Sequence, residues 1–443
     1  MTGPLTTLDL RGTATGDPHA LRQVLPRPAA AEEPPIEQVR AVIERVRAEG
    51  DAALRALTKE FDGVDVDDIR VDPDDVAAAP GRIDAALRAA LAVAHEHITA
   101  YHRAQLHDPA RYEHDGLVVR ELVRPVDRAG LYVPAALAPL LSTVLMTAVP
   151  AKVAGVPETV VCTAPGPDGR VDDGILAACA IAGVDEVFRV AGPAAIAALA
   201  HGTGSIRPVD VIVGPGSARV AQAKREVASR GLVGVPSSFA GPSEVVVIAD
   251  SAATVEDVAV DVVLQAEHGP DGLAWLICWD DEVAAAVNDA VARIVEASPR
   301  RAHIEATLAD AGYAVVVDGP DAAIDVANVI APEHLELQVA DPEALLPRVK
   351  HAGAVFCGPW APASVGDYVA GPNHVLPTYG SARFAGALRV DDFCKHVHVV
   401  SLDEGALRSL APHVEAMAGA EGLAAHADSV RQRVARLDAR VGS

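Results

Sequence analysis

Two polar side chains near the end of one expected helix have the types and spacing to bind a divalent metal ion. The segment Gln265-Ala266-Glu267-His268 is followed directly by Gly269-Pro270, a pair that is typical of a helix end. In a helix over about 255–268, Gln265 and His268 lie three residues apart and share the last turn. An imidazole and an amide carbonyl can both bind a divalent cation there. A packed or exposed histidine without a ligand is the alternative.

A carboxylate and an imidazole are adjacent in the segment Ala331-Pro332-Glu333-His334-Leu335. The segment lies where an apolar helical pattern ends at a proline. Such a pair suits general acid–base chemistry, in which His334 takes a hydroxyl proton and Glu333 activates a water molecule. A Glu-His pair in a surface loop is the alternative, and these two residues alone do not decide between the two interpretations.

A third stretch, residues 360–389, is long, polar and rich in Gly and Pro. We expect little regular structure in it, and a loop of this length in a compact enzyme is usually functional. A disordered insertion is the alternative, but the apolar and aromatic content of the stretch argues against it. Its side chains that could do chemistry are Asp367, Tyr368, Asn373, His374, Tyr379, Arg383 and Phe384.

A glycine-rich turn, Gly214-Pro215-Gly216-Ser217, lies between an expected strand over 209–213 and an expected helix that ends near residue 229. Backbone N–H groups at the start of such a helix can bind a phosphate group. Tight turns between strand and helix also use glycine, and the full G-x-G-x-x-G spacing is absent. The turn is therefore only a modest indication of a dinucleotide site.

Short apolar strands that alternate with helices of about ten residues predict the elements that position these groups, and they indicate parallel sheets. One such series begins near residue 130 and a second near residue 241. We expect an α/β fold with two Rossmann-like lobes and a helical C-terminal segment that has to pack on something else. The expected domains are an N-terminal arm (1–35), a first lobe with the candidate metal and acid–base residues (36–131 with 245–388), a second lobe (132–244) and the C-terminal segment (389–443).

Composition excludes several classes of partner. The formal net charge of −24 repels phosphate backbones and anionic lipids, so neither nucleic-acid nor membrane binding is expected. Residues 129–151 carry no charge, but glycine and prolines interrupt them, so we expect a buried strand and helix rather than a membrane span. The five cysteines form no C-x-x-C pair, which argues against a disulfide framework and for a cytoplasmic location.

Taken together, these segments resemble the histidinol dehydrogenase family, whose members catalyse the last two oxidations of histidine biosynthesis. The matching pieces run from about Gly130 to His426 in the order of the family. They are GLYVP, APLLSTVLM, VGPGS, AGPSEVVVIAD, LQAEHGP, APEHLEL, VGDYVAGPNHVLPTYGSARF and EGLAAH. The resemblance implies an NAD-dependent dehydrogenase of a small amino alcohol, with one Zn²⁺ per subunit. It also implies a homodimer that exchanges its C-terminal segments and shares its active sites.

The resemblance also implies a role for individual residues. The zinc ligands would be Gln265, His268, Asp367 and, from the partner subunit, His426. Glu333 and His334 match the catalytic pair. The substrate would contact Ser142, Ser243, His374 and the partner's Glu421, besides His334 and the zinc ligands. The cofactor positions are Tyr132, Ala194 and Ser217.

The implied reaction converts L-histidinol through L-histidinal to L-histidine with two NAD. His334 would remove the hydroxyl proton as hydride leaves, and water activated by Glu333 would add to the bound aldehyde. Departures from the family pattern gather on the NAD side, where Ala194 and Ser217 replace Gln and Asn. Ala135-Ala136 replaces Gly-Gly, and residues 235–239 lack an Asp of the family. We therefore expect weak NAD binding.

Two other functions compete with histidinol oxidation. A family paralogue could oxidise another small polar alcohol, such as a sulfonated diol or an intermediate of specialised metabolism, and the altered cofactor positions favour it. Retention of Ser243, His374 and Glu421 favours histidinol. A catalytically silent scaffold is the third candidate, and the intact Glu333, His334 and ligand types argue against it.

Overall fold

The computed structural model describes residues 3–26, 35–135, 139–236, 243–266 and 272–441. These residues form two compact units, each described here by itself. Unit 1 comprises Met1–Gln105 and Val126–Phe393, and unit 2 comprises Leu106–Pro125 and Cys394–Ser443. Unit 1 contains two parallel sheets with helices around them, so the expected α/β fold is confirmed.

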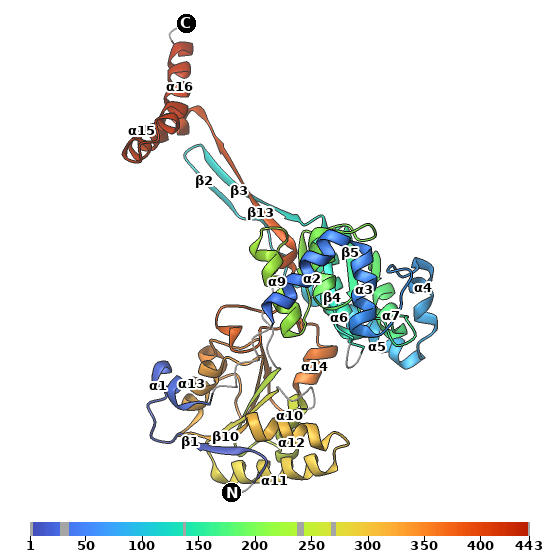
Figure 1. The fold of residues 1–443 in the computed structure, drawn as a ribbon. Coiled ribbons are helices and arrows are strands. Elements are labelled where there is room, and N and C mark those ends of the chain that lie inside the picture. Colours follow the sequence, from blue (N-terminus) through green and yellow to red (C-terminus); the bar gives the residue numbers. More distant parts are fainter. Residues whose placement is uncertain (1–2, 27–34, 136–138, 237–242, 267–271, 442–443) are drawn as a thin grey trace. The chain divides into compact units, whose positions relative to one another are not determined.

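The larger sheet has six parallel strands in the order β1-β10-β9-β8-β11-β12 (Figure 1). Its strands β8 and β9 are nearly continuous apolar runs, because helices cover both faces of the sheet. One face is covered by α10 (Val255–Ala266), α11 (Asp281–Ala297) and α12 (Arg301–Ala311), and the other by α13 (Pro320–Ile330) and α1 (Pro18–Val24). The strands are β1 (Thr6–Asp9), β8 (Glu244–Ala249), β9 (Leu273–Cys278), β10 (Gly312–Val316), β11 (His334–Gln338) and β12 (Ala354–Cys357).

The smaller sheet has four parallel strands in the order β6-β5-β4-β7. Both sheets thus contain the strand order of a Rossmann fold. The order in which successive strands are added reverses beside β4 and beside β8. The strands are β4 (Arg128–Val133), β5 (Glu158–Thr163), β6 (Glu186–Arg189) and β7 (Val211–Val213). The helices that follow them are α6 (Leu141–Ala154), α7 (Asp173–Ala182), α8 (Gly192–His201) and α9 (Ala218–Ser229).

The uncharged stretch 129–151 forms β4 and most of α6, as expected for a buried strand and helix. All six residues of β4 are buried, and α6 is enclosed because α5, α7 and β4 pack around it. In the part of the chain that the structure describes, no helix is long and apolar enough to cross a membrane.

Two domain boundaries differ from the expectation. The helices of residues 36–104 pack with the four-stranded sheet, since α2 contacts α8 and α9 and α5 contacts α6, so grouping 36–131 with 245–388 is wrong. The arm is not separate either, because β1 pairs with β10 and α1 packs on α13. An amphipathic pattern shows that a helix is covered, not which sheet covers it. These helices are α2 (Ile36–Glu49), α3 (Asp51–Asp62), α4 (Pro73–Ala78), the 3₁₀ turn η1 (Ala79–Gly81) and α5 (Ala85–Ala104).

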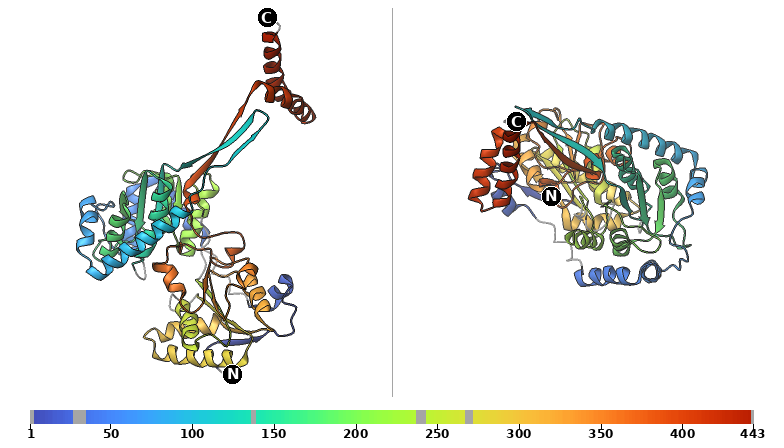
Figure 2. Two further views of the ribbon diagram at one scale, coloured as in Figure 1. Left: turned by 180° about the vertical axis from the view of Figure 1, so that it is seen from behind. Right: turned by 90° about the horizontal axis from the view of Figure 1, so that it is seen from above.

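Unit 2 is an antiparallel ribbon of three strands, in the order β13-β3-β2, that leads into two helices packed on each other (Figures 1 and 2). The strands are β2 (Arg111–His114), β3 (Leu117–Pro125) and β13 (Cys394–Leu402), and the helices are α15 (Glu404–Ala420) and α16 (Ala424–Val441). We expected a mainly helical C-terminal segment and missed β13. Its mixed polar and apolar sequence, CKHVHVVSL, is exposed along most of its length, and its partner strand lies far away in the chain.

Short elements complete unit 1. The stretch 360–389, expected to be largely irregular, contains one short helix and a 3₁₀ turn. The remaining elements are η2 (Leu346–Arg348), α14 (Ala363–Tyr368), η3 (Ser381–Arg383) and η4 (Val390–Phe393).

Candidate active site

Glu333 and His334 lie at the beginning of β11, a central strand of the six-stranded sheet. Helix α13 ends at Ile330, and Ala331 follows in the left-handed region with φ of 56°, which turns the chain into the strand. Both side chains are buried, with 7% of Glu333 and 3% of His334 exposed. The pair is therefore not an exposed Glu-His pair in a surface loop.

Two carboxylates face the His334 ring. Its Nε2 lies 3.2 Å from Asp367 Oδ1, and its Nδ1 lies 3.7 Å from Glu333 Oε2. The ring of Phe356 stacks against it at a centroid distance of 5.9 Å. Burial lowers the pKa of His334, but the carboxylates of Glu333 and Asp367 outweigh burial and raise the pKa to about 9. The two carboxylates therefore favour the protonated imidazole at neutral pH.

Glu333 is held by Glu244, the first residue of β8, and by Ser243 directly before it. Its Oε2 accepts a hydrogen bond of 3.2 Å from the backbone N–H of Glu244, and the Ser243 hydroxyl also bonds the carboxylate. Burial raises the pKa of Glu333 to about 7, against the opposing charge of His334. A carboxylate with this pKa can take up and release a proton at neutral pH, as a general base must.

His374 joins the same group through Asp367. Its Nδ1 lies 2.8 Å from the Asp367 carbonyl oxygen, so Nδ1 carries the hydrogen, and Nε2 accepts from the Thr143 hydroxyl at 3.2 Å. Burial lowers the pKa of His374, which keeps the ring neutral. Since Ser142 precedes Thr143 in the first turn of α6, the structure brings the Ser142 segment next to His374.

Asn373 anchors this loop to two helices. Its Nδ2 donates to the Met146 carbonyl at 2.6 Å, and it lies 3.4 Å from Nε2 of the buried His102. Its Oδ1 accepts from the N–H of Val375 at 2.9 Å. This role of Asn373 was not predicted, and neither were His102 and Thr143, since a buried polar residue on an apolar helix has no distinctive pattern.

Two of the four expected zinc ligands are found in unit 1. Gln265 lies in the last turn of α10, and its side chain is 2% exposed. Among the residues that the structure describes, none donates a hydrogen bond to its Oε1, and a buried carbonyl oxygen in that state costs about 1–3 kcal/mol. Asp367 lies in α14 beside His334. An unpaired amide oxygen and a carboxylate fit a zinc site.

The other two expected ligands are not tested by this geometry. His268 lies outside the described residues, and His426 is an exposed residue of α16 in unit 2, as is Glu421 at the end of α15. Among the described residues, no group of three His, Cys, Asp or Glu side chains could hold a metal ion.

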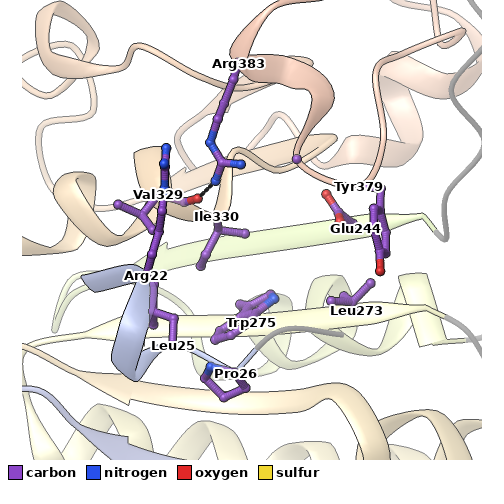
Figure 3. A pocket seen from close by; sticks show the side chains of 11 residues that line it. Arg22, Leu25, Pro26, Glu244, Leu273, Trp275, Val329, Ile330, Tyr379 and Arg383 are labelled. Carbon is purple, nitrogen blue, oxygen red and sulfur yellow. Dashed lines mark hydrogen bonds between the residues drawn. The ribbon is translucent and has the colours of Figure 1, made fainter. Parts of the chain in front are cut away.

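A cavity of about 620 Å³ lies at the amino ends of β8 and β9, next to this centre (Figure 3). Glu244 is part of its wall, opposite Arg383, whose guanidinium donates to the Val329 carbonyl. Burial and the charge of Glu333 raise the pKa of Glu244 to about 8, so this carboxyl is mostly protonated at neutral pH. Glu244 thus lies between the cavity and Glu333, and it was not predicted as a site residue.

The raised pKa of Glu244 predicts that the free energy of unfolding depends on pH. Its pKa is about 8 in the folded chain, against an ordinary value of 4.5 for an exposed glutamate. Its contribution is therefore complete below about pH 4.5 and is lost as pH rises through 8. Relative to Glu244→Gln, the wild type is expected to lose free energy of unfolding between about pH 5 and pH 9. Denaturation of both proteins in chelator across this range measures the difference, and a pH-independent difference would contradict the assignment.

The expected cofactor positions meet at the carboxyl edge of the four-stranded sheet. Tyr132 is near the end of β4, and its hydroxyl accepts from the N–H of Gly192 at the start of α8, at 3.2 Å. Ala194 lies in the same helix, and Ser217 is the N-cap of α9 after the neighbouring β7. Open α/β sheets bind ligands at this edge, where the strand order reverses.

Gly214 and Asp62 also influence Tyr132 at this edge. Gly214 has φ of 105°, and a Cβ there would lie 2.1 Å from the Tyr132 carbonyl oxygen, so only glycine fits. The charge of Asp62, at the end of α3, contributes to raising the pKa of Tyr132, although burial is the main cause. Asp62, which was not predicted as a site residue, thus places a carboxylate near this hydroxyl.

Gly366 lets α14 pack closely against Phe356, whose ring stacks on His334. A Cβ on Gly366 would lie 2.4 Å from Phe356 Cε1. Gly366→Ala is therefore expected to displace α14 and its Asp367, with a stability loss of about 1–3 kcal/mol and a loss of activity. Gly319→Ala is the control, since a Cβ there meets no described atom within 4 Å. Unfolding and turnover assays on both variants check this, and equal behaviour of the two would contradict it.

Known proteins match this chain over nearly its whole length. The family model described as histidinol dehydrogenase matches residues 25–434. A protein named histidinol dehydrogenase from Symbiobacterium thermophilum is 46% identical over 429 residues, covering 95% of this chain and 96% of the relative. A protein of the same name from Synechococcus sp. is 47% identical over 403 residues, with 90% and 92% covered.

A solved structure agrees with these relatives. The crystal structure of histidinol dehydrogenase from Elizabethkingia anophelis matches with a TM-score of 0.93 and 32% sequence identity. The match covers 99% of this chain and 100% of that one. The parallel α/β fold described above is thus also the fold of that solved protein.

Proposed function

Since the chain belongs to the histidinol dehydrogenase family of oxidoreductases, we propose that it oxidises L-histidinol through L-histidinal to L-histidine with two NAD and one zinc ion per subunit. The observation that carries the proposal is the buried pair Glu333 and His334 at the start of β11, with Asp367 of α14 beside His334. It combines a carboxyl with a pKa of about 7, an imidazole and a carboxylate that can bind a metal ion.

The zinc ion would be held by Gln265, His268, Asp367 and His426 of the partner subunit. The unpaired Gln265 Oε1 supports this set, because a cation would satisfy it. When bound, zinc supplies a fixed positive charge that orients the amino alcohol and polarises its oxygen. The remaining polar contacts of the substrate would come from Ser142, Ser243, His374 and the partner's Glu421.

His334 is assigned the hydroxyl proton in both oxidations. The imidazole must first lose the proton that Glu333 and Asp367 favour on it, and a cation bound to Asp367 would favour that loss by opposing a second positive charge beside it. Its Nε2 lies beside Asp367 Oδ1, so this nitrogen lies nearest to the proposed ligand. Phe356 fixes the plane of the ring. Positioning of this kind contributes to the rate because the reacting groups need no further ordering. Removal of the hydroxyl proton accompanies the departure of hydride to NAD.

Glu333 is assigned the water of the second step. The aldehyde needs an added hydroxyl group before a second hydride can leave, and a buried carboxylate can take the proton of the attacking water. The N–H of Glu244 and the hydroxyl of Ser243 hold Glu333 in place. Its pKa of about 7 lets it return this proton at neutral pH.

We also propose a homodimer in which unit 2 of one subunit completes the site of the other. Unit 2 exposes many large apolar side chains, and its two helices have a small core of their own. Such exposed apolar surface favours association. The exposed members are Leu106, Tyr112, Val397, Val400, Leu402, Leu410, Val414, Met417 and Leu423.

Weak NAD binding is expected because Ser217 and Ala194 stand where the family has longer amides. Ser217→Asn is expected to tighten NAD binding by about fivefold or more, through one added hydrogen bond of about 1 kcal/mol or more. Ala194 is only 5% exposed, so a longer side chain there needs more room. Ser229→Asn, in the last turn of the same helix, is the control. Calorimetric titration measures this, and micromolar NAD affinity of the unchanged chain would contradict the expectation.

The competing proposal is a paralogue that oxidises another small polar alcohol, which the altered cofactor positions favour. The test is turnover of zinc-loaded protein with NAD on L-histidinol and on a panel of polar alcohols, including a sulfonated diol. Turnover of histidinol with the highest kcat/KM supports the first proposal. Turnover of another alcohol without turnover of histidinol would overturn it.

A further inference from the structure

Strand β11 carries a stripe of polar side chains where apolar ones are expected. His334, Glu336 and Gln338 point to the same face of the sheet and are 3%, 1% and 4% exposed. Leu335 and Leu337 point to the other face and join the core there. A central strand of a parallel sheet is buried on both faces and is usually apolar throughout. Three adjacent buried polar groups therefore depend on specific partners.

Glu336 connects β11 to the short helix that carries Asp367. Its Oε1 accepts a hydrogen bond of 3.0 Å from the N–H of Ala363, the first residue of α14. One turn later, Asp367 Oδ1 lies 3.2 Å from Nε2 of His334. Strand and helix are thus joined at two points, Glu336 with Ala363 and His334 with Asp367. This closed arrangement fixes where Asp367 lies.

Glu336 also connects β11 to the helix that carries Gln265. Gln338 Nε2 lies 3.3 Å from Glu336 Oε2 and 3.3 Å from Oδ2 of Asp261 in α10. Burial, and next a side-chain hydrogen bond with Glu336, raises the pKa of Asp261 to about 8. Asp261 therefore carries a proton that it can donate to Glu336 at neutral pH. Gln265, with its unpaired Oε1, follows Asp261 by one helical turn.

We infer that Glu336 is a positioning residue for the metal centre. Glu336 holds α14 through the Ala363 N–H and holds α10 through Asp261. It thereby sets the separation of Asp367 and Gln265. The inference rests on the proposed zinc site, since those two residues are its ligands in unit 1. Groups that support ligands from behind typically change metal affinity by 10–100-fold when removed.

The test is the affinity of the full-length protein for Zn²⁺ alone, measured by competition with a chromophoric chelator. Glu336→Ala removes the acceptor for Ala363, whereas Glu336→Gln keeps an oxygen for Ala363 and offers an amide to Asp261. Asn288→Ala is the matched control, because it removes another buried acceptor of the same lobe, 3.1 Å from the Leu5 N–H. Thermal unfolding of each variant is recorded beside the affinity.

Glu336→Ala is expected to weaken zinc binding by about 10–100-fold. Glu336→Gln should remain within about threefold of the wild type, and Asn288→Ala should lose stability without losing zinc affinity. Wild-type zinc affinity in folded Glu336→Ala would overturn the inference, and so would an equal loss of zinc affinity in Asn288→Ala. Neither result would affect the proposed function. If Glu336→Ala does not fold, Asp261→Ala and Asp261→Asn replace the pair, and only the alanine variant should bind zinc weakly. A wild-type chain that binds no zinc overturns the proposed function, and the inference with it.

Discussion

Replacing His334 with asparagine is expected to lower kcat for histidinol oxidation by about 10²- to 10⁴-fold, the range for loss of a general base. Asparagine cannot take a proton, but its side-chain amide can still donate to Asp367, so the surroundings should change little. Zinc content and thermal stability are therefore expected to stay near those of the wild type. Steady-state formation of NADH at saturating histidinol and NAD measures the effect on kcat.

Phe393 provides a control that is unrelated to chemistry. Its side chain is fully buried in unit 1, so Phe393→Leu should lower stability while leaving kcat close to that of the wild type at low temperature. A loss of less than about tenfold in His334→Asn would show that His334 is not the base. A loss of zinc in that variant would show that His334 acts as a ligand.

Replacing His426 with alanine is expected to abolish zinc binding and turnover, although His426 lies in unit 2, outside the unit that holds the catalytic pair. In a symmetric dimer with shared sites, a subunit with His334→Asn and a subunit with His426→Ala repair each other at one of the two sites. Mixed dimers, isolated with two different affinity tags, should therefore recover about half of the wild-type activity. Each variant alone should remain inactive.

The mixed dimer separates shared sites from sites within one subunit. If each subunit used its own His426, both sites of the mixed dimer would lack one essential residue. Activity no greater than that of the parent variants would then contradict the exchange. His413→Ala, which removes another histidine of unit 2, is the control and should retain both zinc and turnover.

The alternation of short strands and helices predicted the fold well, because buried parallel strands such as β8 (EVVVIA) are unmistakable apolar runs. The assignment of helices to sheets failed for residues 36–104. Their apolar stripes are complete, but the sheet they cover depends on contacts between residues far apart in the chain. Strand β13 was missed for the same reason, since its stability depends on pairing with β3 rather than on an apolar pattern.

The site was predicted in part. Glu333 and His334 were found as an adjacent pair, but their burial was not evident, since the helix, Ala331 and the strand had to be placed first. Glu244 and Asp62 were missed because each is a single acidic residue at the end of an element, which is usually a surface position. Their significance depends on neighbours that only the folded chain supplies, Glu333 and Tyr132 respectively.

The role of Glu336 could not be predicted from the sequence either. The segment HLELQ reads as an alternating strand with one polar face exposed to water, the usual meaning of such a pattern. In the structure the polar face is buried and its groups pair with α10 and α14. No strand was predicted for this segment, and alternation alone does not show that its polar face is buried.

The most direct test of the central claim is the stoichiometry of the reaction. Zinc-loaded protein with a limiting amount of L-histidinol and excess NAD should form two NADH for each histidinol consumed, with L-histidine as the product and no aldehyde released. This is expected because one site holds both the base for the alcohol and the base for the water. One NADH per substrate with free aldehyde, or no NADH at all, would contradict the account.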